Sequence, residues 1–209
     1  MKRHFYSVGF APENRIGKAV ELESYDLAGI TPESISEAAK LGELPSGFDD
    51  SVLNEGRRLG SLPSGIKLMI KRGKKDHLDF DVVVNCLTWI ILSDRLAHAL
   101  KKVAFSDIEL LPVAIRGMRR EILRPDFCVV NVLRILDAMS ESKTLRSRVK
   151  MGTNHPVIKL ALIGRKVPTE VNVFRVSVCV FDFLVDDVAM RALGEQPHDG
   201  LAFIPVEQE

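Results

Sequence analysis

The sequence predicts an α+β protein in which mixed or antiparallel sheets carry a few short helices. Three apolar runs rich in β-branched residues have the composition of β-strands: FCVVNVL, VIKLALI and FRVSVCVFDFLV. A length of 209 residues, of which 46% are hydrophobic, is enough to bury a substantial core. The C-terminal part also contains two related strand-helix-strand units, at residues 91–113 and 184–206.

The two units align without a gap at an offset of 93 residues. The first reads ILSDRLAHALKKVAFSDIELLPV and the second LVDDVAMRALGEQPHDGLAFIPV, with five identities in 23 positions. The shared pattern is stronger than the identities. Each copy runs from an apolar pair through a capping residue, an amphipathic helix and a polar turn to an apolar strand that ends in Pro-Val. The alternative to an internal repeat is a chance similarity between two short segments that each contain a helix and a strand.

The helix of each unit begins after a residue suited to N-capping. Ser93 and Asp186 hold equivalent positions, and each side chain can accept hydrogen bonds from free backbone N–H groups of the first turn. Asp94 and Asp187 follow and place negative charge at the positive end of the helix. The spacing i, i+3, i+4, i+7 predicts the buried stripe of the first helix: Leu96, Ala99, Leu100 and Val103. Its first half recurs in the second helix as Ala189, Ala192 and Leu193.

The strand of each unit carries a proline near its end. Because proline cannot donate to a sheet ladder, Pro112 and Pro205 predict a strand end or a sheet edge. Residues 1–79 differ from the rest of the chain in the distribution of their turn and loop residues. This difference predicts a separate region of strand, helix and loops, packed on an α+β domain of residues 80–209. One continuous domain is the alternative.

Composition argues against several classes of partner. With 29 Lys and Arg against 28 Asp and Glu, the net charge of +1 gives no global field for nucleic acid or an anionic membrane. No apolar run reaches the roughly 20 residues of a membrane span, and MKRHFYSVGF lacks a secretory apolar core. Cys86, Cys128 and Cys179 lie in apolar stretches, as buried thiols do. We expect a cytoplasmic protein that binds neither nucleic acid nor membrane.

Motifs for catalysis, metal or cofactor are missing from the sequence. It contains no Gly-x-Ser-x-Gly elbow, no His-Glu-x-x-His and no Cys-x-x-Cys. Alternation places His77, Asp79 and Asp81 on one strand face, but a metal would need further ligands that the sequence does not nominate. Trp89 stands in an apolar strand and is expected in the core. We therefore predict no catalytic residue, no metal and no cofactor.

One basic cluster follows the first unit, in IRGMRREILR. It consists of Arg116, Arg119, Arg120 and Arg124, with Glu121 as the acidic residue among them. A solvated surface is the plain interpretation. The functional one is a contact surface for an acidic protein partner.

The second half, with NVLRILDAM and the twice-used unit, resembles immunity family eleven of bacterial polymorphic toxin systems. Similar members end in a phrase like FIPVE, and this chain ends in FIPVEQE. The resemblance covers residues 80–209; residues 1–79 match less clearly, and the usual Ser-Glu-Arg helix start is Ser93, Asp94 and Arg95 here. It implies a cytoplasmic antidote that binds a cognate toxin domain and neutralises it by occlusion, and it carries over no catalytic residue. The alternatives are an enzyme with an unrecognised site between the two halves and a protein that self-associates through a sheet edge.

Overall fold

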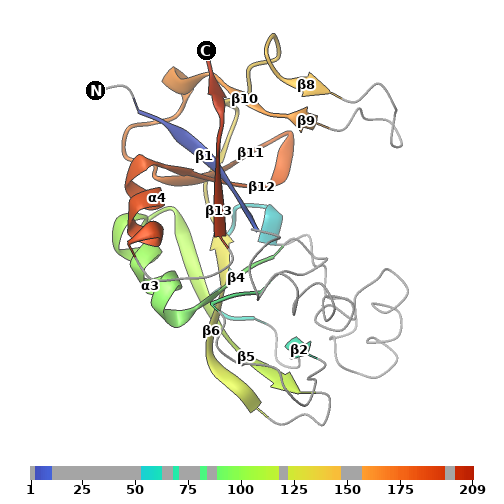
Figure 1. Cartoon of the computed structure of the whole chain (residues 1–209), viewed down its shortest axis with the longest axis vertical. Coiled ribbons are helices and arrows are strands. Elements are labelled where there is room, and N and C mark those ends of the chain that lie inside the picture. The colour runs from blue at the N-terminus through green and yellow to red at the C-terminus, as the bar shows by residue number, and fades with distance from the viewer. Residues whose placement is uncertain are drawn as a thin grey trace.

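The computed structural model describes residues 3–10, 53–62, 68–70, 81–83, 89–117, 122–146, 157–195 and 201–209. These residues form an α+β fold with two α-helices and with strands in antiparallel and mixed sheets, which confirms the predicted fold class (Figure 1).

The first large sheet contains the long antiparallel hairpin of the first unit. Its strand order is β2 (Leu68–Ile70), β5 (Ile108–Gly117), β6 (Ile122–Val132), β4 (Ile90–Ser93) and β3 (Val82–Val83). β2 runs parallel to β5, and the other neighbours are antiparallel. The residues of the run FCVVNVL up to Val132 form the buried second half of the central strand β6.

The second large sheet joins the two ends of the chain. Its order is β13 (Leu201–Pro205), β1 (Phe5–Phe10), β12 (Cys179–Asp186), β11 (Val173–Val176) and β7 (Ile135–Leu136). Two small sheets pair β10 (Ala161–Leu162) with β14 (Glu207–Gln208), and β8 (Leu145–Arg146) with β9 (Val157–Lys159). A 3-10 turn, η2, covers Gly164–Lys166.

The two α-helices pack against each other and connect strands of their own sheets (Figure 1). Helix α3 (Asp94–Val103) leads from β4 to β5, and helix α4 (Asp187–Gly194) leads from β12 to β13. In each sheet one antiparallel strand lies between the two strands that the helix joins. That strand is β6 in the first sheet and β1 in the second, so both units form the same split strand-helix-strand arrangement. The internal repeat is thus a structural repeat.

The pairing register of the two inserted strands is also the same. Cys128 of β6 lies opposite Leu92 and Pro112, and Tyr6 of β1 lies opposite Val185 and Pro205. These partners differ by the 93-residue offset found in the sequence. Tyr6 is therefore the counterpart of Cys128, although the two strands come from different parts of the chain.

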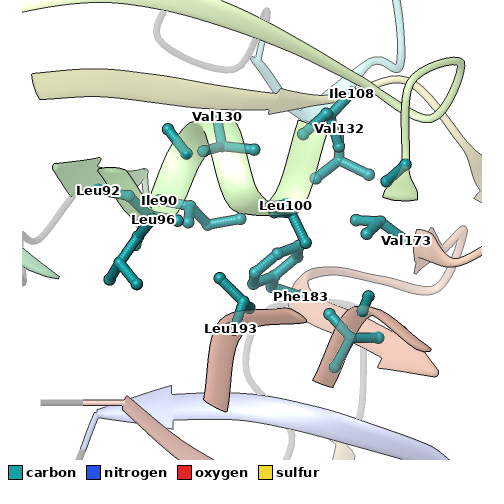
Figure 2. Packing of buried hydrophobic residues seen from close by; sticks show 14 of the residues in the cluster. Ile90, Leu92, Leu96, Leu100, Ile108, Val130, Val132, Val173, Phe183 and Leu193 are labelled. Carbon is teal, nitrogen blue, oxygen red and sulfur yellow. The ribbon is translucent and has the colours of Figure 1, made fainter. Parts of the chain in front are cut away.

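The helices bury their apolar stripes in a shared core (Figure 2). Leu96 and Leu100 of α3 and Leu193 of α4 are fully buried in one cluster, which also contains Phe183. A second cluster contains Trp89, which is buried as predicted, and a third contains Phe5 packed edge-on against Phe174, with ring centroids 5.6 Å apart.

Two local predictions need correction. Ser93 is the N-cap residue of α3, but its side chain makes no capping bond; its hydroxyl donates to Oδ1 of Asp81 at 2.5 Å instead. Asp186 does cap α4, accepting from Val188 N and Ala189 N. Pro112 lies inside β5 and does not end the strand, although no described strand pairs with β5 at Pro112 on the side away from β6. Pro205 ends β13, an edge strand among the described residues.

Proline is tolerated inside β5 for a geometric reason. Alternate residues of a strand direct their N–H groups to opposite neighbours. On the side away from β6, β2 pairs with residues 115–117 of β5, so within the described residues Pro112 removes no ladder bond there.

Candidate functional site

The predicted arginine cluster lies where β5 ends and β6 begins. Arg116 lies opposite Ile122, and Arg124 lies opposite Ile115, so the structure brings Arg116 and Arg124 onto neighbouring strands. Ile122, opposite Arg116, is 54% exposed. Arg119 and Arg120 lie outside the described residues. The role of this segment in partner binding stays a prediction.

Arg124 is engaged within its own strand. Its Nε and Nη2 atoms donate to the two carboxylate oxygens of Asp126, both at 2.7 Å, and its guanidinium lies 5.1 Å from the ring centroid of Phe127. The hydrogen bonds from Arg124 hold the pKa of Asp126 below its ordinary value, against the opposing effect of burial. Part of the basic charge of this segment is therefore neutralised by Asp126, which the sequence pattern did not indicate.

A second surface, which sequence reasoning missed, surrounds the turn between α3 and β5. Phe105 is 75% exposed there and is the most exposed large hydrophobic side chain of the described residues. Lys101 Nζ lies 4.7 Å from the centroid of its ring and donates to the carbonyls of Phe105 at 2.7 Å and Ile108 at 2.5 Å. The available signal was an aromatic residue in a polar turn, between Ala104 and Ser106.

Cationic side chains lie near this turn, and the carboxylates of Asp107 and Glu109 are buried. Arg134 Nε contacts Asp107 Oδ1 at 3.2 Å, and Asp107 itself is fully buried. The exposed Arg58 lies near Lys101: burial is the main cause of the lowered pKa of Lys101, and the charge of Arg58 is the next. The solvent-exposed charges around Phe105 are therefore mainly positive.

The segment 53–62 is held against the hairpin by a buried polar cluster. Glu109 accepts from Leu59 N and Gly60 N, both at 2.9 Å, and from Asn131 Nδ2 at 2.9 Å. Burial opposes ionisation of Glu109, but these hydrogen bonds and the charge of Arg58 together lower its pKa. This anchoring fixes the position of the chain that carries Arg58.

The acidic strand face considered for a metal is only partly described. His77 and Asp79 lie outside the described residues. Asp81 accepts from Ser93 and also from Arg95 Nη2 at 2.6 Å, so it holds the start of α3. Within the described residues no group of three or more His, Cys, Asp or Glu side chains is arranged to hold a metal.

Cys128 is the cysteine whose surroundings the structure describes. Burial, followed by the hydrogen bond to Asp94 and its negative charge, raises the pKa of the Cys128 thiol to about 12. A thiol with so high a pKa is not a nucleophile at neutral pH. Among the described residues, no helix is long and apolar enough to cross a membrane.

The comparisons with known proteins agree with the sequence resemblance and extend it. A sequence model described as immunity protein family (Imm11) matches residues 13–208, so the match includes most of the N-terminal region that resembled the family less clearly. No curated protein matches the chain significantly. Since the family match spans nearly the whole chain, this protein belongs to the immunity protein family Imm11.

Proposed function

We propose that this protein is an antidote that binds a cognate bacterial toxin domain in the cytoplasm and neutralises it by occlusion. The observation that carries the proposal is the family match over residues 13–208. Occlusion requires a shaped surface with complementary charge, and no reactive group needs to be assembled.

The arginine segment at residues 116–124 supplies one such surface. Arginine is enriched in protein interfaces, and Arg116 flanks the exposed Ile122 at this end of the hairpin. We propose that the segment faces an acidic region of the toxin and speeds its association. Because Arg124 is paired with Asp126, part of the charge of this segment is offset within β6.

Co-expression tests the proposed function. The expected toxin is the variable C-terminal domain of a large secreted protein, and the gene adjacent to that of this chain is to be examined for it first. Cells that express this domain in the cytoplasm should stop growing, and co-expression of this chain should restore growth and give a co-purifying complex. If growth stays arrested and no complex forms, the antidote proposal is wrong.

The double variant Arg119→Glu, Arg120→Glu tests the surface. Association with the toxin domain should slow and depend less on salt, while the melting temperature stays nearly constant. Arg165→Glu, which changes an exposed charge on η2, is the matched control. Unchanged association rates in the double variant would remove this segment from the interface and leave the antidote proposal intact.

Self-association is a second candidate, favoured by one observation. β13 is an edge strand among the described residues, and its Ile204 is 57% exposed. An exposed apolar edge strand can pair with a second copy. Light scattering on the purified chain should give a concentration-dependent mass if this edge is used, and Ile204→Lys should abolish it.

A further inference from the structure

We infer that Phe105 is the apolar anchor of the toxin interface and inserts into a recess that the toxin surrounds with carboxylates. This inference rests on the proposed function and adds to it the binding face and the chemistry of the partner. The side chain is 75% exposed, Lys101 lies over its ring, and Arg58 and Arg134 lie close to Lys101 and Asp107 of the same turn.

The backbone that carries Phe105 is rigid. Ala104 N donates to Leu100 O at 2.9 Å, Asp107 N donates to Ala104 O at 3.0 Å, and Leu133 N donates to Asp107 O at 2.7 Å. Asn172 ties the same turn to the second sheet, because its Nδ2 donates to Val103 O at 2.6 Å. An aromatic side chain on so constrained a turn loses little conformational entropy on binding, which is the property of an interface anchor.

Folding gives little reason for an aromatic residue at this position. Most of the Phe105 ring remains in water, and its one described side-chain partner is the ammonium of Lys101 at 4.7 Å. Lys101 already bonds to two backbone carbonyls of the turn, which any residue at position 105 would provide. The exposed ring therefore contributes more to an interface than to the fold.

The charges around Phe105 determine the kind of partner. Arg58 and Lys102 are exposed, and Arg134 is partly exposed. The carboxylates of Asp107, which pairs with Arg134, and of Glu109, on which the charge of Arg58 acts, are both buried. On the 53–62 segment the exposed Glu55 is paired with Arg57 at 2.8 Å, so it does not cancel Arg58. A partner with an acidic rim around an apolar recess matches this arrangement.

The anchor and the arginine segment lie at opposite ends of β5, separated by roughly 30 Å at about 3.3 Å per residue. The two surfaces should affect different rate constants. Charges at 116–124 act at a distance and change the association rate, whereas a buried aromatic contact changes the dissociation rate.

The inference is tested by measuring the kinetics with which this protein binds the immobilised cognate toxin domain. Phe105→Ala should raise the dissociation rate by at least about tenfold. The dissociation rate of Phe105→Leu should lie between those of Phe105→Ala and the parent chain. Arg58→Glu should slow association several-fold. Ile158→Ala, which truncates a 64% exposed side chain on β9, and Arg165→Glu are the matched controls and should behave as the parent chain.

The melting temperature separates binding from folding. Loss of an exposed cation-π contact should lower it in Phe105→Ala by no more than about 4 °C. If the parent chain binds the toxin domain and Phe105→Ala dissociates no faster, Phe105 is not the anchor of the interface, while the antidote proposal stands. If the parent chain does not bind at all, the proposed function fails first.

Two further outcomes would assign Phe105 to another partner and overturn the inference. One is self-association of the parent chain that Phe105→Ala abolishes. The other is salt-sensitive binding of a labelled single-stranded RNA that the same substitution weakens.

Discussion

The thiol of Cys128 donates a hydrogen bond to Oδ1 of Asp94 across 3.1 Å. The counterpart of this pair in the second unit is Tyr6, whose hydroxyl donates to Oδ1 of Asp187 at 3.2 Å. In each case the inserted strand is tied to the first residue of the helix that crosses it. The repeat therefore extends from backbone topology to a specific polar contact, made by different side chains.

Alkaline pH should destabilise the protein through these two contacts. Burial and the neighbouring aspartate raise the pKa of Cys128 from 9.0 to about 12, and the same two causes raise the pKa of Tyr6. A raised folded-state pKa means that the stability is present below pH 9 and is lost as the pH rises toward 12. Urea unfolding from pH 7 to 11 should show this loss, and it should be smaller in Cys128→Ala. An equal loss in both proteins would contradict the role of Cys128.

Leu100→Ala and Leu193→Ala should each lower the free energy of unfolding by about 2–5 kcal/mol, because both side chains are fully buried where α3 and α4 meet. Lys102→Ala, on the exposed side of α3, is the control and should change it by less than about 0.5 kcal/mol. Chemical denaturation measures all three. Losses below half a kcal/mol for the leucines would mean that the helices do not pack as described.

Asp107→Ala should lower the free energy of unfolding more than most other single substitutions. The fully buried carboxylate accepts from Asn172 N at 2.8 Å and Val173 N at 3.3 Å, so it joins the turn after α3 to the second sheet. Its removal leaves two backbone donors without this acceptor, and we expect a loss of about 3–5 kcal/mol. Arg134→Ala should lower the stability less, because Arg134 is partly exposed to solvent. The two variants are compared by thermal unfolding.

Glu109 should make the protein sensitive to acid. Although burial raises its pKa, hydrogen bonds from Leu59, Asn131 and Gly60 and the charge of Arg58 lower it overall below the ordinary 4.5. A depressed folded-state pKa means that the stability is present above about pH 4.5 and is lost as the pH falls through the folded value. Glu109→Gln should flatten the fall in stability between pH 5 and 3. An unchanged acid profile in this variant would exclude Glu109 as a cause.

The two helix caps should respond differently to truncation. Asp186 accepts from Val188 N at 3.0 Å and Ala189 N at 2.9 Å and also contacts Arg3, so Asp186→Ala should cost about 1–3 kcal/mol. Asp186→Asn keeps the cap and should recover part of this loss. Ser93→Ala should act through Asp81 instead, so its effect should largely disappear in an Asp81→Ala background.

The local pattern of the sequence was sufficient to predict the repeated units. Spacing of apolar residues correctly identified Leu96, Leu100, Ala189 and Leu193 as buried, and capping residues placed both helix starts at the correct positions. The other predicted stripe residues are only partly buried: Ala99, Val103 and Ala192. These features depend on residues within one or two helical turns, so they are visible in a short window. The resemblance in the C-terminal half likewise led to the correct family.

The candidate surfaces were only partly accessible from sequence. The arginine segment was visible as a charge cluster, but its Arg124 is paired with Asp126, a contact that depends on side-chain geometry. Phe105 was not singled out, because an apolar residue beside a helix end is as compatible with burial as with exposure. Only the packing of the turn leaves its ring in water.

Tertiary structure alone decided which strand enters each unit. β6 follows its unit directly, but β1 comes from the start of the chain, and Phe5 pairs with Asp186 far along the sequence. Strand pairing over such a separation depends on burying two faces against each other, and no local periodicity encodes the partner. The same long-range packing redirected the Ser93 hydroxyl to Asp81 and buried the carboxylates of Asp107 and Glu109, because each acquired its partners only when distant segments met.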